Sequence, residues 1–225
     1  MAITLTKGQK IDLRKETGES LTNFCVGVNW GAIEKKVKGF FSTKTVIEDV
    51  DLDLSCILTD SNGELVDYIY SPEYNGYLQR NKLPLGKLTT NDGALRHSGD
   101  DRQGDTGGDD GLDNEVITVD LNRVNPKVDK IFFFINIYLK DGQTHDFSNI
   151  PYAKIRMYEG TSSKVNKIHS SFDITTDKSY SNKRALIMAK LYKRNVEWKF
   201  DAIGEPTDDK IFLETISNIL KNFAK

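Results

Sequence analysis

The 225-residue chain has little cysteine, histidine and proline, with two, three and five residues of these types. Cys25 and Cys56 lie inside strand-like runs without the spacing of metal ligands, so we expect both to be reduced core residues. The three histidines are far apart in the sequence, and no G-x-S-x-G motif supports a nucleophilic triad. These residues therefore indicate neither a disulfide framework nor a serine hydrolase.

Long apolar runs and an excess of positive charge are also missing. No segment approaches the roughly 20 apolar residues that cross a bilayer, and the N-terminus lacks a basic start followed by an apolar stretch. The chain has 31 Lys and Arg against 33 Asp and Glu, which gives a formal net charge of −2. A nucleic-acid binder needs surplus cations against phosphate. We therefore expect a cytoplasmic protein without a transmembrane segment, a signal peptide or a nucleic-acid partner.

About ten strand-like runs occupy most of the chain. Alternation is clear at 24–30, whose larger side chains share one face. The run 130–139 is apolar on both faces, so we expect a central strand that is covered on both sides. Clusters of Gly, Asn, Asp and Pro separate the runs, and no long helical pattern lies between them. The sequence predicts an all-β, two-sheet β-sandwich in one domain, 1–225, whose other strands are 9–13, 50–58, 65–70, 115–121, 152–159, 169–174, 185–192 and 196–203.

A helix and two irregular stretches complete the predicted organisation. Apolar residues recur at helical spacing over about 208–224, and Thr207 with the two aspartates after it is the expected N-cap. We expect this helix to pack on the sandwich, with a partner-binding helix as the alternative. The stretch 35–45 is expected to be a basic, exposed loop. The stretch 71–98 has no periodicity, which is typical of functional or disordered loops.

An acidic, glycine-rich loop follows at 99–115, with seven carboxylates, five glycines and a single base, Arg102. Carboxylates and backbone carbonyls form the oxygen shell that Ca²⁺ prefers. Without a cation, each close pair of carboxylates repels by about 4 kcal/mol at an effective dielectric constant of about 20. The loop lacks His and Cys, which argues against zinc, copper or an iron–sulfur centre, and it does not fit the EF-hand pattern. A solvated, disordered acidic loop is the alternative. The carboxylates are Asp100, Asp101, Asp105, Asp109, Asp110, Asp113 and Glu115.

A second acidic element precedes this loop. Asp49, Asp51 and Asp53 alternate with apolar residues, so they are expected to project from one face of a strand. Carboxylates in a row on a strand destabilise it unless they are solvated or share a cation. We expect the strand and the loop to supply calcium ligands. The spacing leaves open whether they form one site or two.

These motifs, in this order, resemble the TerD family of tellurium-resistance and general-stress proteins. The resemblance covers most of the chain, and its expanded loops are similar to those of a TerZ-like branch. It implies a calcium-binding β-sandwich in a cytoplasmic protein associated with tellurite and other stress and with phage or colicin resistance, and it implies no catalysis. The segments that carry it are 5–10, 26–30, 49–54, 97–110, 115–121, 190–194 and 197–204.

The resemblance also implies a ligand set and partners. The family often has the unbroken motif G-D-D-E. In this chain residues 111–114 separate the second Asp of that motif from Glu115. Asp113 is therefore the alternative to Glu115 as a ligand. The implied partners, besides calcium ions, are other TerD-family proteins or a membrane-associated stress complex. The ligands that the resemblance places in the D-x-D strand and the G-D-D loop are Asp51, Asp53, Asp100, Asp101, Asp105, Asp109 and Asp110.

We therefore expect a non-enzymatic, calcium-binding stress-response protein, in which Ca²⁺ orders the acidic loop and creates a binding or scaffold surface. One alternative is a metal-dependent hydrolase of phosphate compounds, which needs a concave pocket with Lys or Arg facing the metal; no basic motif lies near the loop in sequence. Another is a calcium-dependent carbohydrate-binding module, which needs aromatic and Asn side chains beside the ion. The candidates for that role are Tyr74, Tyr77, Asn75 and Asn81.

Overall fold

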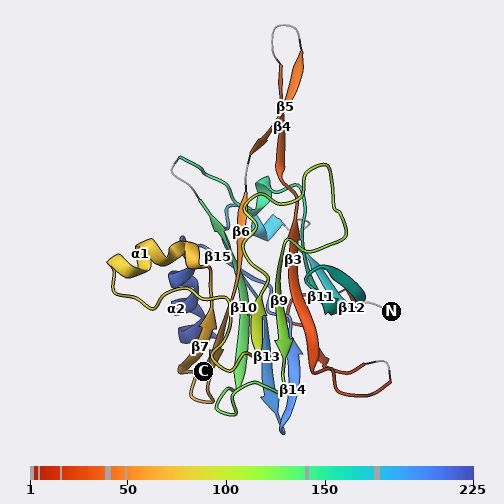
Figure 1. Cartoon of the computed structure of the whole chain (residues 1–225), viewed down its shortest axis with the longest axis vertical. Coiled ribbons are helices and arrows are strands. Elements are labelled where there is room, and N and C mark those ends of the chain that lie inside the picture. Colours follow the sequence, from red (N-terminus) through yellow and green to blue (C-terminus); the bar gives the residue numbers. More distant parts are fainter. Residues whose placement is uncertain are drawn as a thin grey trace.

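The computed structural model describes residues 3–4, 6–15, 17–38, 42–48, 50–139, 142–174 and 178–225. It confirms the all-β, two-sheet sandwich (Figure 1). One sheet has the order β1-β12-β11-β3-β9-β8, with β1 (Ile3–Thr4), β3 (Asn23–Trp30), β8 (Leu95–His97), β9 (Glu115–Asp120), β11 (Ala153–Thr161) and β12 (Lys164–Asp173). The other has the order β2-β14-β13-β10-β6-β7, with β2 (Lys10–Asp12), β6 (Asp51–Thr59), β7 (Leu65–Ile69), β10 (Lys130–Tyr138), β13 (Ala185–Arg194) and β14 (Glu197–Asp201), and β15 (Glu205–Thr207) pairs with β13.

The main core lies between the two sheets and follows from the alternation of their strands. Leu52 and Leu54 of β6 point into it, as do the larger side chains of β3. Trp30, at the end of β3, is fully buried, and its Nε1 donates to the carbonyl oxygen of Val50 at 2.8 Å. This bond ties the end of one sheet to the start of β6 in the other sheet.

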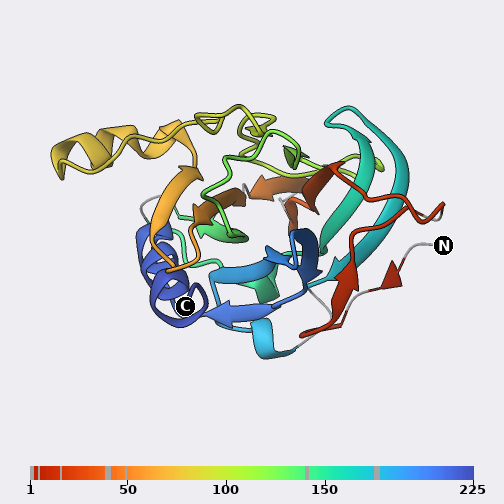
Figure 2. The same ribbon diagram turned by 90° about the horizontal axis from the view of Figure 1, so that it is seen from below.

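Strand β10 is central and covered on both faces, as its sequence predicts. It pairs with β6 on one side and with β13 on the other. Phe133 faces the main core, whereas Phe132 and Phe134 face a second apolar cluster beneath the C-terminal helix α2 (Phe212–Asn222). Figures 1 and 2 show α2 on the side of the molecule away from β11 and β12. The helix therefore covers the outer face of the seven-stranded sheet.

The predicted start and cap of this helix were wrong, although its apolar stripe does pack on the sheet. The helix begins at Phe212, after an N-cap residue, Ile211, that makes no side-chain cap hydrogen bond. Thr207 belongs to β15, where it pairs with Ala185, and its hydroxyl donates to Asp209 Oδ2 at 2.6 Å. Pairing with β13 holds this segment extended, which delays the helix by about one turn.

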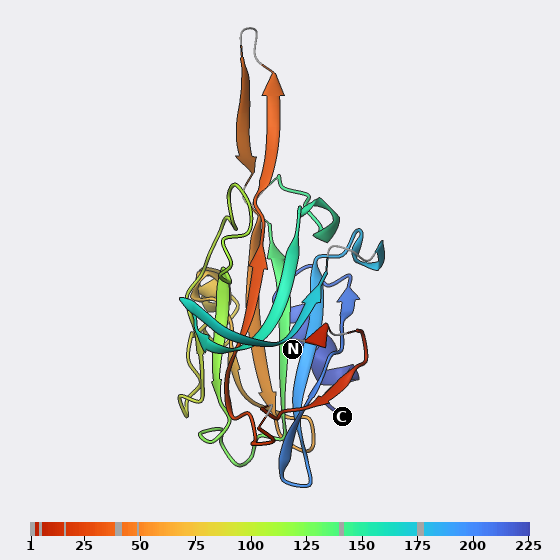
Figure 3. The ribbon, with the colours of Figure 1, turned by 90° about the vertical axis from the view of Figure 1, so that its right-hand side faces the viewer.

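The stretch 35–45 was predicted to be a loop, and this was wrong for its described part. Strands β4 (Ile33–Lys38) and β5 (Thr43–Glu48) form an antiparallel hairpin that projects from the sandwich (Figures 1 and 3). Residues 39–41 lie outside the described residues. Both faces of the hairpin are exposed, and cross-strand pairs such as Lys35 with Val46 mix charged and apolar side chains. No single face is buried, so the sequence carries no alternation there.

The stretch 71–98 contains short elements that its lack of periodicity concealed. A 3₁₀ turn, η1 (Pro72–Tyr74), leads into the short helix α1 (Asn75–Arg80), and β8 follows. The Ser71 side chain caps η1 by accepting from the Glu73 N–H. Among the described residues, no helix is long and apolar enough to cross a membrane.

Candidate metal centre

The structure brings Asp51, Asp53 and Asp100 together; we call them the strand cluster. One carboxylate oxygen of each lies within 4.8 Å of those of the other two. Asp51 and Asp53 come from β6 and are both 4% exposed, whereas Asp100 comes from the loop after β8. Asp49 lies outside the described residues.

Strand alternation and a turn place these three side chains. Because Leu52 and Leu54 point into the core, the aspartates of β6 point to the outer face of the same sheet. Asp53 there lies opposite Asn136 of β10 and accepts a hydrogen bond from the Tyr74 hydroxyl of η1. Asp100 Oδ2 accepts from Arg102 Nε at 3.1 Å. The site thus joins one strand, one loop and the 3₁₀ turn.

The electrostatics of the strand cluster disfavour the ionised carboxylates of Asp53 and Asp100. Burial raises the pKa of Asp53 well above its ordinary value, and the Glu115 carboxylate raises it further. Burial also raises the pKa of Asp100. Among the described Lys and Arg residues, none forms an ion pair with Asp53. A cation at this point would favour the ionised carboxylates.

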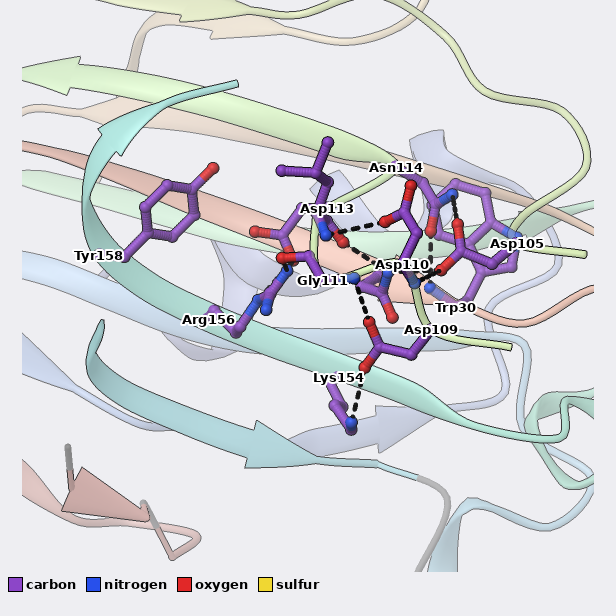
Figure 4. Close-up of polar contacts among 12 residues, drawn as sticks. Trp30, Asp105, Asp109, Asp110, Gly111, Asp113, Asn114, Lys154, Arg156 and Tyr158 are labelled. Atoms are coloured by element: carbon purple, nitrogen blue, oxygen red, sulfur yellow. Dashed lines mark hydrogen bonds and ion pairs between the residues drawn. The ribbon is translucent and has the colours of Figure 1, made fainter. Parts of the chain in front are cut away.

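A second group, Asp105, Asp109 and Asp110, lies within the acidic loop; we call it the loop cluster (Figure 4). One carboxylate oxygen of each again lies within 4.8 Å of the others. Asp105 Oδ2 accepts from the Tyr152 hydroxyl and from Asn29 Nδ2, each at 2.9 Å. Asp109 Oδ2 accepts from Lys154 Nζ at 2.9 Å. The loop is therefore anchored to β3 and β11 by its carboxylates.

Backbone contacts fix the loop against Trp30. The Asp105 N–H donates to the Trp30 carbonyl, and the Ala32 N–H donates to the Asp105 carbonyl, both at 2.8 Å. Gly104 has φ +75°, and a Cβ there would lie 2.5 Å from Trp30 Cδ1. Only glycine allows this backbone to lie so close to the indole.

Replacing Gly104 with alanine is expected to destabilise the protein by about 1–3 kcal/mol more than replacing Gly107, because only the first change forces a methyl group onto Trp30. Gly107 is a matched control, since it has φ +80° and no atom within 4 Å of an added Cβ. Urea unfolding of both variants measures the difference. Equal losses would contradict the proposed close contact.

The other three predicted ligands lie outside both clusters. Asp113 is buried and forms an ion pair with Arg156 of β11 at 2.8 Å (Figure 4). Glu115 accepts from the Leu54 N–H at 2.6 Å and from the Asp101 N–H at 3.2 Å. Asp101 Oδ1 in turn accepts from two loop N–H groups, those of residues 103 and 104. These three carboxylates hold the loop together through the backbone and through Arg156.

His97 lies beside Glu115, with its Nε2 3.3 Å from Glu115 Oε2. Burial lowers the pKa of His97 to about 4, and burial raises the pKa of Glu115 above its ordinary value. The His97 Nδ1 accepts from the Gly99 N–H at 3.0 Å. The lowered pKa favours a neutral His97 side chain, which accepts this hydrogen bond at the start of the acidic loop.

Sequence reasoning missed Arg156, the partner of Asp113, and it considered Tyr74 only as an aromatic residue of a carbohydrate site and not as the partner of Asp53. Gly27 was the available signal for the first, because a glycine inside a strand often marks a close approach. Gly27 lies opposite Arg156 in the sheet, and a Cβ there would lie 2.1 Å from Asp113 Oδ2. No sequence signal indicated that Tyr74 would meet β6.

Comparisons with known proteins agree with this fold. The family model described as the TerD domain matches residues 1–218. The stress response protein SCP2 of Bacillus subtilis (strain 168) is 32% identical over 219 residues, which cover 96% of this chain and 98% of that protein. The tellurium resistance protein TerD of Serratia marcescens is 32% identical over 209 residues, which cover 91% of each chain. Relatives from that organism named TerX and TerZ match as well.

A solved structure shows the same fold. It is a crystal structure of a homologue of the telluride resistance protein TerD from Streptomyces coelicolor A3(2), with a TM-score of 0.60 and 13% identity. The match covers 91% of this chain and 98% of that one. From the family model and these relatives, the chain belongs to the TerD family.

Proposed function

We propose that this member of the TerD family is a calcium-binding stress-response protein. The observation that carries the proposal is that six carboxylates form two groups of three, the strand cluster and the loop cluster. All six donors are oxygens, which suits Ca²⁺ and not a metal that prefers nitrogen or sulfur. Relatives named for stress response and tellurium resistance support the stress-response part.

The strand cluster has the arrangement needed to couple ion binding to loop order. Asp51 and Asp53 sit on a buried strand, whereas Asp100 sits at the start of the acidic loop. An ion held by all three would join the loop to the sandwich and remove the repulsion between the carboxylates. An ion that binds the folded protein and not the unfolded chain would also stabilise the folded protein by linkage. The ordered loop is then the surface that we propose for binding a partner.

The test is a calcium titration by calorimetry on chelator-stripped protein, with Mg²⁺ as competitor and thermal melts beside it. We expect saturable binding in the micromolar range or tighter. At a free calcium concentration 100-fold above the dissociation constant, linkage stabilises the protein by about 2.7 kcal/mol, which raises the melting temperature. The absence of both heat and a melting shift would contradict the proposal.

Two single substitutions distinguish calcium binding at the strand cluster from calcium binding at the loop cluster. Asp53→Asn is expected to remove binding at the strand cluster and to leave the loop cluster intact, and Asp110→Asn is expected to do the reverse. Asp208→Asn is the matched control, because it removes the same charge from an exposed side chain that pairs with Lys183. If the control loses as much calcium as either variant, the binding is only a general effect of negative charge.

The remaining parts of the proposal rest on the resemblance to the family. We propose a cytoplasmic location, no catalytic activity, and other TerD-family proteins or a membrane-associated stress complex as partners.

One observation bears on the two alternatives. Tyr74, which contacts Asp53, also lines a groove beside the strand cluster, together with Tyr77. The two candidate amides for sugar binding are already engaged locally: Asn75 Oδ1 accepts from the Gly86 N–H at 2.6 Å, and Asn81 Nδ2 donates to the Tyr77 carbonyl at 2.8 Å. This disfavours a carbohydrate site. The same groove contains cationic side chains of the kind that a phosphate compound would need.

A further inference from the structure

A groove of about 570 Å³ lies on the outer face of the seven-stranded sheet. Helix α1 forms one wall, the end of β10 forms the floor, and the segment that leads into α2 forms the opposite wall. Its volume falls in the range of small-molecule sites. Tyr74 and Asn136 belong both to this groove and to the surroundings of Asp53, so the groove adjoins the strand cluster.

Three cationic residues from distant parts of the sequence line the groove. They are Arg80 at the end of α1, Arg184 just before β13, and Lys210 just before α2. Within the described part of the chain, none of the three forms an ion pair. The one acidic residue of the lining, Glu73, is held by Arg102 of the acidic loop. The lining of the groove therefore contains three cationic residues and one carboxylate that is already paired, on a protein whose net charge is −2.

The groove also offers aromatic surface. Tyr77 and Tyr138 are 43% and 36% exposed, and Tyr74 packs edge-on against Tyr138 with ring centroids 5.5 Å apart. Tyr74 is held from behind by Phe212, at 4.3 Å between centroids. Exposed, braced aromatic rings can stack on a planar ligand, and Tyr does so at a low cost in conformational entropy.

The floor contains an unused acceptor. Asn136 is 3% exposed, and its Nδ2 donates to Thr215 Oγ1 at 2.9 Å. Its Oδ1 is buried and accepts no hydrogen bond from the described residues. A buried polar atom without a partner is costly, and a ligand donor would satisfy it.

We propose that this groove binds a small organic phosphate that carries a planar ring. The guanidinium groups of Arg80 and Arg184 would bind phosphate oxygens through charged, bidentate hydrogen bonds. The ring would stack on Tyr77 or Tyr138, and a ring donor would reach Asn136. A neutral sugar would use the tyrosines but would leave the three cations without a partner. The proposed ligand does not need calcium in order to bind, although the groove adjoins the strand cluster. The folded chain brings basic residues to this groove, whereas the sequence has no basic motif near the acidic loop.

The test uses calorimetric titration of the full chain with ADP, pyrophosphate, adenosine and a neutral disaccharide, in chelator and again with Ca²⁺. We expect ADP to bind more tightly than pyrophosphate or adenosine, and the disaccharide not to bind. The double variant Arg80→Gln/Arg184→Gln is expected to weaken ADP binding by roughly 10–100-fold. Tyr77→Ala is expected to weaken ADP binding and to leave pyrophosphate binding unchanged.

The double variant Lys36→Gln/Lys38→Gln on the exposed hairpin is the matched control for the loss of two positive charges, and melting curves check that each variant folds. The inference is overturned if ADP does not bind at millimolar concentration, or if the double arginine variant binds it as the control does. Pyrophosphate binding equal to that of ADP, with no effect of Tyr77→Ala, would overturn the aromatic part. Because ADP is titrated without calcium as well, its failure leaves the calcium proposal standing, and the reverse also holds.

Discussion

Replacing Arg156 with glutamine is expected to destabilise the fold by about 3–5 kcal/mol, because it leaves the Asp113 carboxylate buried without its charged partner. The two side chains are 2.8 Å apart, with side-chain exposures of 10% and 0%. Gly27 provides the space for Asp113, so the carboxylate is enclosed. Urea unfolding measures the loss. A change of less than 1 kcal/mol would show that solvent reaches the carboxylate.

The matched control is the double variant Arg156→Gln/Asp113→Asn, which removes both charges. It is expected to be more stable than Arg156→Gln alone, since no charge then stays buried without a partner. Equal stability of the two would argue against a charge effect and for lost packing of the arginine stem.

The same variant is expected to show a pH dependence of known sign. Burial raises the pKa of Asp113 to about 6, although the Arg156 guanidinium opposes the rise. Without Arg156 the pKa rises further. A group whose pKa is raised by folding stabilises the protein below its unfolded pKa, and this contribution is lost as the pH rises through the folded pKa. The defect of Arg156→Gln is therefore expected to be larger at pH 8 than at pH 5.

Phe212→Ala is expected to destabilise the protein by about 3–5 kcal/mol, because it leaves a cavity between α2 and the outer face of the sheet. Phe212 is 2% exposed, and its ring centroid lies 4.8 Å from that of Tyr70 and 4.3 Å from that of Tyr74. The neighbouring Ile211 is 42% exposed, so Ile211→Ala is a matched control with an expected loss below about 1 kcal/mol. Urea unfolding measures both variants.

The position of Phe212 adds a second expectation. Phe212 braces Tyr74, and Tyr74 donates to Asp53. Removing Phe212 is therefore expected to weaken the calcium binding that we propose at the strand cluster and not the binding that we propose at the loop cluster. Calorimetry on Phe212→Ala combined with Asp110→Asn isolates the strand cluster. Unchanged affinity there would show that Tyr74 does not need this support.

The fold was predictable from local pattern wherever one face of an element is buried. The alternation at Phe24 and Trp30, and the doubly apolar run around Phe133, identified strands that the structure confirms. Alternation did not predict the hairpin β4–β5, because residues such as Val37 are exposed there and neither face of the hairpin is buried. Local pattern also misplaced the cap of α2, because the pairing of Thr207 with β13 is not a local property.

By itself, the sequence determined the sandwich, the acidic strand and the acidic loop, because alternation and composition are properties of neighbouring residues. Tertiary structure alone decided which carboxylates lie close together. It placed six of them in two clusters, and it paired Asp113 with Arg156, which lies 43 residues away in the sequence. It also brought Arg80, Arg184 and Lys210 to one groove. Such groupings depend on strand order and register between distant segments, and the spacing of residues along the chain does not contain them.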